Sequence, residues 1–209
     1  RLAVENRELD AEREVARGWF ARENDRREQL VSLERRKAQM LAGTRRESEQ
    51  ITSAALELGL RARKLSSLLD ALYGRSDPGL AGLPILDFRG LLDWPVAGRV
   101  TVEFGPRVDP RYGTRVPHNG LDFETVPGSE VRAVYPGKVL FAAPFEGLGQ
   151  MVVVQHAGRV FTLYAGLSEL RVRKEDVLLL HSVVGRSGSS LYFEIRVDKS
   201  PEVPRAWLR

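Results

Sequence analysis

Hydrophobic and polar residues follow two different periods along this chain, and the first of them is helical. Residues 1–73 contain no proline and are rich in Glu, Arg, Ala and Leu, which all favour a helix. From Ile51 to Leu72, apolar residues recur at alternating steps of four and three, as in a coiled coil. The pattern therefore predicts a helical coiled-coil arm over residues 1–75.

The middle of this arm departs from the regular pattern. Glu23 and Lys37 stand where the apolar seam would pass, and unpaired charge is costly to bury. Either the register shifts there, or the chain turns near residues 42–44 and folds back as a second helix. The arm alone is typical of a spacer or dimerisation helix, but its charged seam favours an arm that binds a partner.

A break in the helical pattern follows the arm. Gly74, Pro78 and Pro84 disfavour a continuing helix. Residues 79–93 are nevertheless rich in apolar side chains, which is unusual for a linker. We therefore assign residues 76–93 as a linker that either covers a binding groove or simply leads into the next domain.

The second period is that of β-strands. Residues 94–209 contain short runs of β-branched and aromatic residues separated by glycine-containing turns. The runs predicted to form strands are residues 99–104, 130–134, 138–142, 150–155, 160–164 and 191–197. The predicted fold class is α+β and multidomain, with an N-terminal helical coiled coil followed by an all-β domain.

Composition narrows the functional classes. The chain has 209 residues and a net charge of +4, with 32 Lys and Arg interleaved with 28 Asp and Glu. Because these charges form no one-signed block, nucleic-acid binding is not favoured. The chain has no cysteine for disulfides or thiolate metal sites, and no apolar run long enough to span a bilayer. It begins without Met, so we expect a processed or trimmed fragment, and any export signal or further N-terminal helix would lie upstream.

Several short motifs in the second half occur in a characteristic order. They are Trp94-Pro95, Phe104-Gly105-Pro106-Arg107, His118-Asn119-Gly120-Leu121-Asp122, Tyr164-Ala165-Gly166-Leu167 and Leu191-Tyr192-Phe193-Glu194-Ile195-Arg196. In this order and spacing, residues 94–208 resemble the LytM or lysostaphin-type peptidases. The resemblance implies a small antiparallel β domain, here residues 94–209, with a groove that holds one zinc ion in active members.

The resemblance also says which residues would hold that zinc. A catalytic zinc needs three protein ligands and one open position for the water nucleophile. His118 and Asp122 match the first two ligand positions of the family, and Tyr192 stands at the third. Ser190 and Gly166 stand where the two catalytic histidines belong. Because these three replacements supply neither a neutral-pH ligand nor a base, we expect a degenerate peptidase domain without catalysis, metal or cofactor.

The remaining histidines do not match the missing positions. His156 precedes an Ala-Gly turn, and His181 is distant in sequence from the motif positions. We therefore expect His118 and Asp122 to remain as a hydrogen-bonded pair on the groove floor, with weak zinc binding as the alternative.

The ending of the chain, residues 190–208, resembles the EnvC type of murein hydrolase activator, which also joins a coiled coil to a degenerate LytM domain. The resemblance implies that the groove binds a self-inhibited N-acetylmuramoyl-L-alanine amidase and that the coiled coil binds an FtsEX-type membrane complex. It also implies a periplasmic or other extracytoplasmic location in the bacterial cell envelope, and a role in cell-wall remodelling and daughter-cell separation. Peptidoglycan is a further candidate partner.

One set of residues is expected to line the partner-binding groove: His118, Asn119, Asp122, Tyr164, Ser190, Tyr192, Glu194 and Arg196. Tyr192, Glu194 and Arg196 alternate along one strand and therefore share one face. Tyr and Arg often contribute most of the binding energy at protein interfaces. The alternative for Arg196 is that it only forms an ion pair with a carboxylate such as Glu194. Two rival functions stay open, a peptidoglycan-binding scaffold and a zinc metallo-endopeptidase with an atypical site.

Overall fold

The structure is a computed structural model that describes residues 2–74, 83–108 and 115–209. The chain divides into two compact units, Arg1–Glu57 and Leu58–Arg209. The first unit is helical throughout its described residues. The second contains the end of the same helix and the whole β domain.

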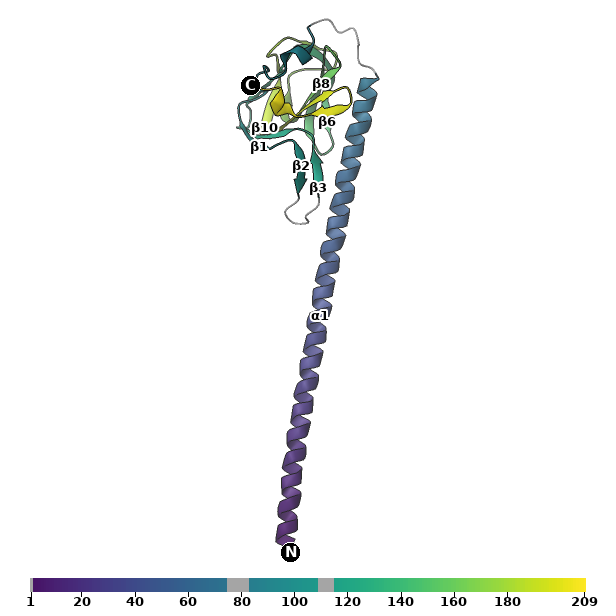
Figure 1. The fold of residues 1–209 in the computed structure, drawn as a ribbon, viewed down its shortest axis with the longest axis vertical. Coiled ribbons are helices and arrows are strands. Elements are labelled where there is room, and N and C mark those ends of the chain that lie inside the picture. Colours follow the sequence, from purple (N-terminus) through teal and green to yellow (C-terminus); the bar gives the residue numbers. More distant parts are fainter. Residues whose placement is uncertain (1, 75–82, 109–114) are drawn as a thin grey trace. The chain divides into compact units, whose positions relative to one another are not determined.

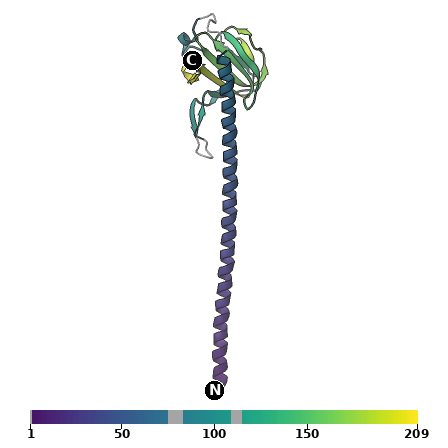
Figure 2. The same cartoon turned by 90° about the vertical axis from the view of Figure 1, so that its right-hand side faces the viewer.

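Helix α1 runs without interruption over Leu2–Tyr73 (Figures 1 and 2). It continues through residues 42–44, so the alternative of a turn at that point is wrong. Trp19, Phe20 and Met40 of the first unit are 68%, 73% and 76% exposed. The long helix is therefore confirmed, whereas a coiled-coil partner for it stays a prediction. No described helix is apolar enough over a sufficient length to cross a membrane.

The last turns of α1, which belong to the second unit, pack against the β domain. Leu69, Leu72 and Tyr73 are buried in one cluster with Phe161 of the sheet. The rings of Tyr73 and Phe161 meet edge to face, with centroids 4.5 Å apart. Residues three and four apart lie on one face of a helix, so the same apolar spacing that predicts a coiled coil here serves packing on a sheet.

The β domain is built on one antiparallel sheet with the strand order β1-β4-β10-β8-β7-β6-β9. The strands in chain order are β1 (Arg99–Val102), β2 (Gly105–Val108), β3 (Arg115–His118), β4 (Leu121–Glu124), β5 (Glu130–Arg132), β6 (Gly137–Phe145), β7 (Gly149–His156), β8 (Val160–Leu170), β9 (Val177–Leu178), β10 (Val183–Val197) and β11 (Ser200–Glu202). Strands β5 and β11 also pair with β10, and β2 and β3 form a separate hairpin (Figure 1). Each of the six predicted runs contains a strand or lies within one. Two short 3-10 helices, η1 (Ile85–Phe88) and η2 (Pro204–Ala206), complete the described elements.

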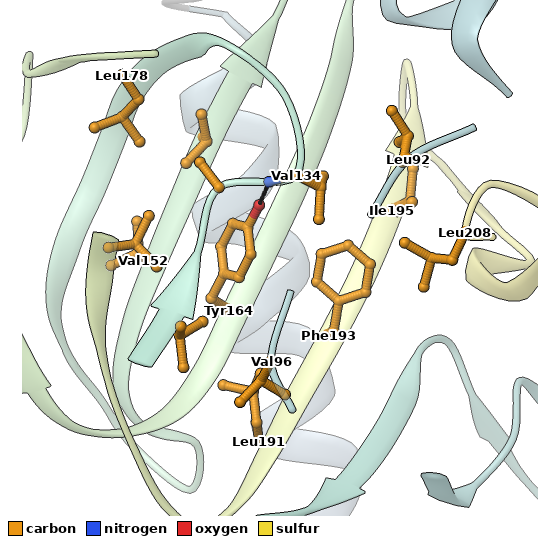
Figure 3. Packing of buried hydrophobic residues seen from close by; sticks show 14 of the residues in the cluster. Leu92, Val96, Val134, Val152, Tyr164, Leu178, Leu191, Phe193, Ile195 and Leu208 are labelled. Atoms are coloured by element: carbon orange, nitrogen blue, oxygen red, sulfur yellow. Dashed lines mark hydrogen bonds between the residues drawn. The ribbon is translucent and has the colours of Figure 1, made fainter. Parts of the chain in front are cut away.

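The main core lies on one face of this sheet, and β10 shows why. Leu191, Phe193 and Ile195 are buried in the main core, because alternate residues of a strand point to the same face. Figure 3 shows these three side chains among the apolar residues of the cluster. The intervening residues of β10 therefore point to the opposite face, where Tyr192 contacts the cluster that contains the end of α1.

Residues of the predicted linker contribute to the main core as far as they are described. Residues 75–82 lie outside the described residues, so the predicted cover is seen only in part. Ile85 and Leu92 are buried in the main core, and Leu92 forms a parallel bridge with Leu208. The apolar contacts to Tyr192 come instead from the cluster that holds the end of α1.

Buried polar side chains of β7 and β8 form hydrogen bonds with the backbone and with each other. The hydroxyl of Tyr164 accepts a hydrogen bond of 3.1 Å from the backbone N–H of Val134 (Figure 3). The two ring nitrogens of His156 lie 2.8 Å from the carbonyl of Pro136 and 2.8 Å from the hydroxyl of Thr162. Because a carbonyl can only accept, Nδ1 of the neutral ring carries the hydrogen. Burial lowers the pKa of His156 to about 4 and raises that of Tyr164 to about 12.

Acid should therefore destabilise the β domain through His156. In the unfolded chain its pKa is near the ordinary 6.5, whereas in the fold it is about 4, so the unfolded state takes up the proton first. This part of the stability is present above pH 6.5 and is lost as the pH falls toward 4. We expect a loss of about 2–3 kcal/mol in the free energy of unfolding between pH 7.5 and 4.5, measured by urea denaturation. The variant His156→Gln should lack this component, and an identical pH profile in both proteins would assign the effect to other groups.

Candidate functional site

The face of the sheet opposite the main core brings five of the predicted residues together. We call it the site face, and it carries His118, Asp122, Tyr192, Glu194 and Arg196. Strands β4 and β10 are antiparallel, and their register sets Tyr192 directly opposite Asp122. Directly opposed residues share a face and lie within side-chain contact. His118 ends β3, and only two residues separate it from the start of β4, which places it at the same edge.

His118, Asp122 and Tyr192 are close neighbours on this face. Nε2 of His118 lies 3.7 Å from Oδ2 of Asp122, and the rings of His118 and Tyr192 have centroids 5.6 Å apart. The two side chains are neighbours, but 3.7 Å is too long for the hydrogen bond expected between them. Nε2 of His118 is buried and has no hydrogen-bond partner among the described residues. Burial raises the pKa of Asp122, and Coulombic interactions with His118 and Arg107 oppose this shift.

Gly120 makes room for the ring of Tyr192. A Cβ at this position would lie 2.4 Å from the carbonyl oxygen of Phe193 and 2.7 Å from Cε2 of Tyr192. Both distances are shorter than real contacts, so any side chain at Gly120 would displace either the strand or the ring. The glycine between His118 and Asp122 therefore sets how closely Tyr192 approaches them.

A chain of hydrogen bonds links the polar residues of β10. The hydroxyl of Tyr192 donates to Oε2 of Glu194 at 2.6 Å, and Nε of Arg196 donates to Oε1 of Glu194 at 2.5 Å. The side chain of Glu194 is fully buried, and that of Arg196 is 11% exposed. Burial raises the pKa of Glu194, which the charge of Arg196 opposes. Burial and the neighbouring Glu194 raise the pKa of Tyr192, so its phenol stays a neutral donor.

The end of α1 packs over this polar chain. Burial raises the pKa of Tyr73 on α1, and the nearby charge of Arg196 opposes this shift. Two ion pairs stand beside the apolar contacts: Lys199 with Asp70 at 3.0 Å, and Lys64 with Glu146. Lys64 and Asp70 lie on α1, whereas Lys199 and Glu146 lie on the β domain. The helix end is therefore held on the site face by a buried apolar cluster, the electrostatic interaction of Tyr73 with Arg196, and two exposed ion pairs.

Tyr164 is a correction to the predicted set. It is fully buried in the main core, not on the site face. In the register of β8 and β10 it stands opposite Phe193, and opposed residues point to the same side of the sheet. Ser190 is exposed at the start of the same run of β10, and Asn119 is partly buried beside His118.

The helix residues Leu69, Leu72 and Tyr73 were not among the predicted site residues. The sequence signal for them is the regular apolar spacing at the end of the arm, which is equally typical of a coiled coil. The spacing alone does not show whether this face of the helix packs on a sheet or on a second helix.

The described residues do not fit a catalytic zinc centre. They contain no group of three or more His, Cys, Asp or Glu placed to hold a metal ion. Tyr192 stands beside His118 and Asp122, and its hydroxyl is engaged by Glu194. At Gly166, with φ of 81°, a Cβ would lie 2.8 Å from the carbonyl oxygen of Ser190, so this position does not accommodate a histidine without movement of the backbone.

Comparison with known proteins gives relatives of two kinds. Residues 116–204 match the sequence model of Peptidase family M23. The DD-carboxypeptidase/endopeptidase Mpg of Neisseria meningitidis is 36% identical over 112 residues, 51% of this chain and 26% of that protein. The murein hydrolase activator EnvC of Escherichia coli is 32% identical over 127 residues, 57% of this chain and 29% of that protein. The chain thus spans less than a third of either relative.

A solved structure extends the likeness to the fold. The crystal structure of a zinc containing peptidase from Vibrio cholerae superposes with a TM-score of 0.52 at 27% sequence identity. The match covers 56% of this chain and 40% of that one.

Proposed function

We propose that this chain, whose residues 116–204 form a peptidase family M23 domain, is a non-catalytic activator of peptidoglycan amidases. The observation that carries the proposal is the environment of Tyr192. It takes the place beside His118 and Asp122 where a third zinc ligand would be needed, and Glu194 holds its hydroxyl. A neutral buried phenol of raised pKa is a poor ligand for zinc at neutral pH.

Hydrolysis would also need a group that moves protons. Such groups are His, Glu, Lys or Tyr side chains with accessible pKa values, placed within hydrogen-bond reach of the reacting atoms. Ser190 and Gly166 stand at the positions where the family resemblance puts histidines, and Gly166 has no room for one. A fold that has lost such groups can still bind a partner, because function belongs to the site and not to the fold.

The site face has the composition of a protein interface. Tyrosine and arginine are enriched at interface positions that contribute most to binding, and Tyr192 and Arg196 flank Glu194 on this face. The face also accepts an amphipathic helix, since the end of α1 packs on it with Leu69, Leu72 and Tyr73 buried. In our proposal a segment of the amidase takes this place, and α1 inhibits activation until it leaves the face.

Release of α1 would then be the regulated step. The docked and released states need differ by only a few kcal/mol for a partner of the arm to shift their populations. We propose that the arm binds an FtsEX-type membrane complex. The protein would then act in the extracytoplasmic cell envelope, in cell-wall remodelling and daughter-cell separation. The named activities of its relatives, a DD-carboxypeptidase/endopeptidase and a murein hydrolase activator, support a place at the peptidoglycan layer.

Dye release from labelled sacculi tests this function. A self-inhibited amidase should release little dye alone, this protein should release none alone, and the mixture should release dye at a rate at least about tenfold higher than the amidase alone. A catalytically inactive amidase variant, mixed with this protein, controls for hydrolysis by the protein itself. Release by the protein alone would favour a metallo-endopeptidase, and binding to sacculi without stimulation would favour a scaffold.

A further inference from the structure

His118 and Asp122 retain the spacing of two ligands of one metal ion. Zinc–ligand bonds of 2.0–2.1 Å in a tetrahedron put two ligand atoms about 3.4 Å apart. Nε2 of His118 and Oδ2 of Asp122 are 3.7 Å apart. Nε2 is also buried without a hydrogen-bond partner among the described residues, which is costly for a polar atom. These two residues therefore form an intact half-site and not a relaxed pair.

Tyr192 closes the remaining side of this half-site. Its backbone is paired with Asp122, and its ring lies edge-on to His118 with centroids 5.6 Å apart. Its hydroxyl, the only side-chain atom able to coordinate a metal, donates to Glu194 instead. Because Gly120 has no Cβ, the ring of Tyr192 lies close against the backbone of Gly120, beside His118.

We propose that Tyr192 is the residue that excludes zinc from this site, and that a histidine at this one position completes a zinc site with His118 and Asp122. The inference does not depend on amidase activation, since it concerns only the metal chemistry of the site face. For zinc binding, this site therefore departs from the family's ligand set at one side chain, that of Tyr192.

Catalysis requires more than this one change. A histidine that handles protons would have to stand at position 166, where the backbone has φ of 81° and a Cβ would approach the carbonyl oxygen of Ser190 to 2.8 Å. A left-handed backbone conformation is unfavourable for residues other than glycine. Zinc binding and hydrolysis are therefore separable in this protein. A single substitution, Tyr192→His, should give zinc binding but not hydrolysis.

Metal analysis of the full chain tests the proposal. After dialysis against zinc, Tyr192→His should retain about one zinc per chain, and its thermal midpoint should rise with added zinc. The wild type, Tyr192→Phe and the double variant His118→Ala/Tyr192→His should retain far less than one. Tyr192→Phe is the matched control, because it removes the bond to Glu194 without supplying a ligand.

Two results would overturn the proposal. Stoichiometric zinc in the wild type would mean that Tyr192 does not exclude the metal, and a folded Tyr192→His without zinc would mean that the half-site is not competent. Folding is checked by circular dichroism. If Tyr192→His folds poorly, refolding with and without zinc replaces the dialysis: recovery with zinc supports the proposal, because a complete site adds its binding free energy to folding, and no recovery contradicts it.

Dye release from sacculi separates this proposal from the proposed function. Zinc-loaded Tyr192→His alone should release no dye, whereas hydrolysis by this variant would contradict the argument from Gly166. Stimulation of an amidase by the wild type does not involve zinc bound to this chain. If the wild type failed to stimulate the amidase, the zinc stoichiometry of Tyr192→His would still test the present proposal.

Discussion

Replacing Leu69 with aspartate should raise the stimulation of the amidase by about tenfold, which corresponds to about 1.4 kcal/mol in the equilibrium between docked and released α1. Leu69 is 1% exposed and belongs to the cluster that joins the end of α1 to the site face. A carboxylate there would be buried without a partner, which costs several kcal/mol, and release of the helix end avoids that cost. The domain should stay folded because its main core lies on the other face of the sheet.

The matched control is Leu60→Asp. Leu60 lies on the same helix nine residues earlier and is 47% exposed, so the same substitution there should leave stimulation unchanged. Both variants are compared with the wild type by dye release at a half-saturating concentration. Equal stimulation by all three would show that α1 does not inhibit the site, and loss of stimulation in a folded Leu69→Asp would make the helix end part of the binding surface.

Replacing Arg196 with alanine should lower the free energy of unfolding by about 3–5 kcal/mol at neutral pH. Glu194 is fully buried, and Arg196 is the cation that accompanies it. Without that cation the carboxylate becomes an unpaired buried charge. In a domain of this size the loss should lower the thermal midpoint by about 10 °C.

The pH dependence gives this prediction a second readout. Burial already raises the pKa of Glu194, and removing the charge of Arg196, which opposes that shift, raises it further. A carboxyl whose folded pKa is raised holds its proton more tightly in the fold, so stability is regained as the pH falls through that pKa. The destabilisation of Arg196→Ala should therefore shrink between pH 8 and pH 5.

The double variant Glu194→Gln/Arg196→Ala is the control for the buried charge. Glutamine keeps an acceptor for the hydroxyl of Tyr192 without a charge, so the double variant should recover most of the lost stability. Urea denaturation of the single and double variants completes the comparison. Equal stabilities for Arg196→Ala and the double variant would show that the loss comes from packing of the arginine stem and not from the charge of Glu194.

Much of this molecule is determined by local sequence. The helix of residues 2–73 follows from residue propensity and the absence of proline, and the strands follow from β-branched and aromatic runs between glycine turns. Alternation along β10 separates Phe193 from its neighbours Tyr192 and Glu194, because successive side chains of a strand point to opposite faces. The ordered motifs likewise predict that His118 and Asp122 come together.

Other features were decided only by tertiary structure. Which face of β8 meets the core depends on its register with β10, and that register places Tyr164 in the core although its residue type suits an interface. The hydrogen bond between Tyr192 and Glu194 requires both the strand geometry and the burial that α1 contributes to.

The end of α1 is the clearest case of this division. Apolar residues at steps of three and four determine that one face of the helix will be buried, but they do not determine the surface that buries it. Here that surface is a sheet that the chain forms more than 80 residues later, where Phe161 meets Tyr73. A periodic pattern records only local geometry, whereas the choice of partner is the sum of contacts between segments distant in sequence, and only the folded chain brings those contacts together.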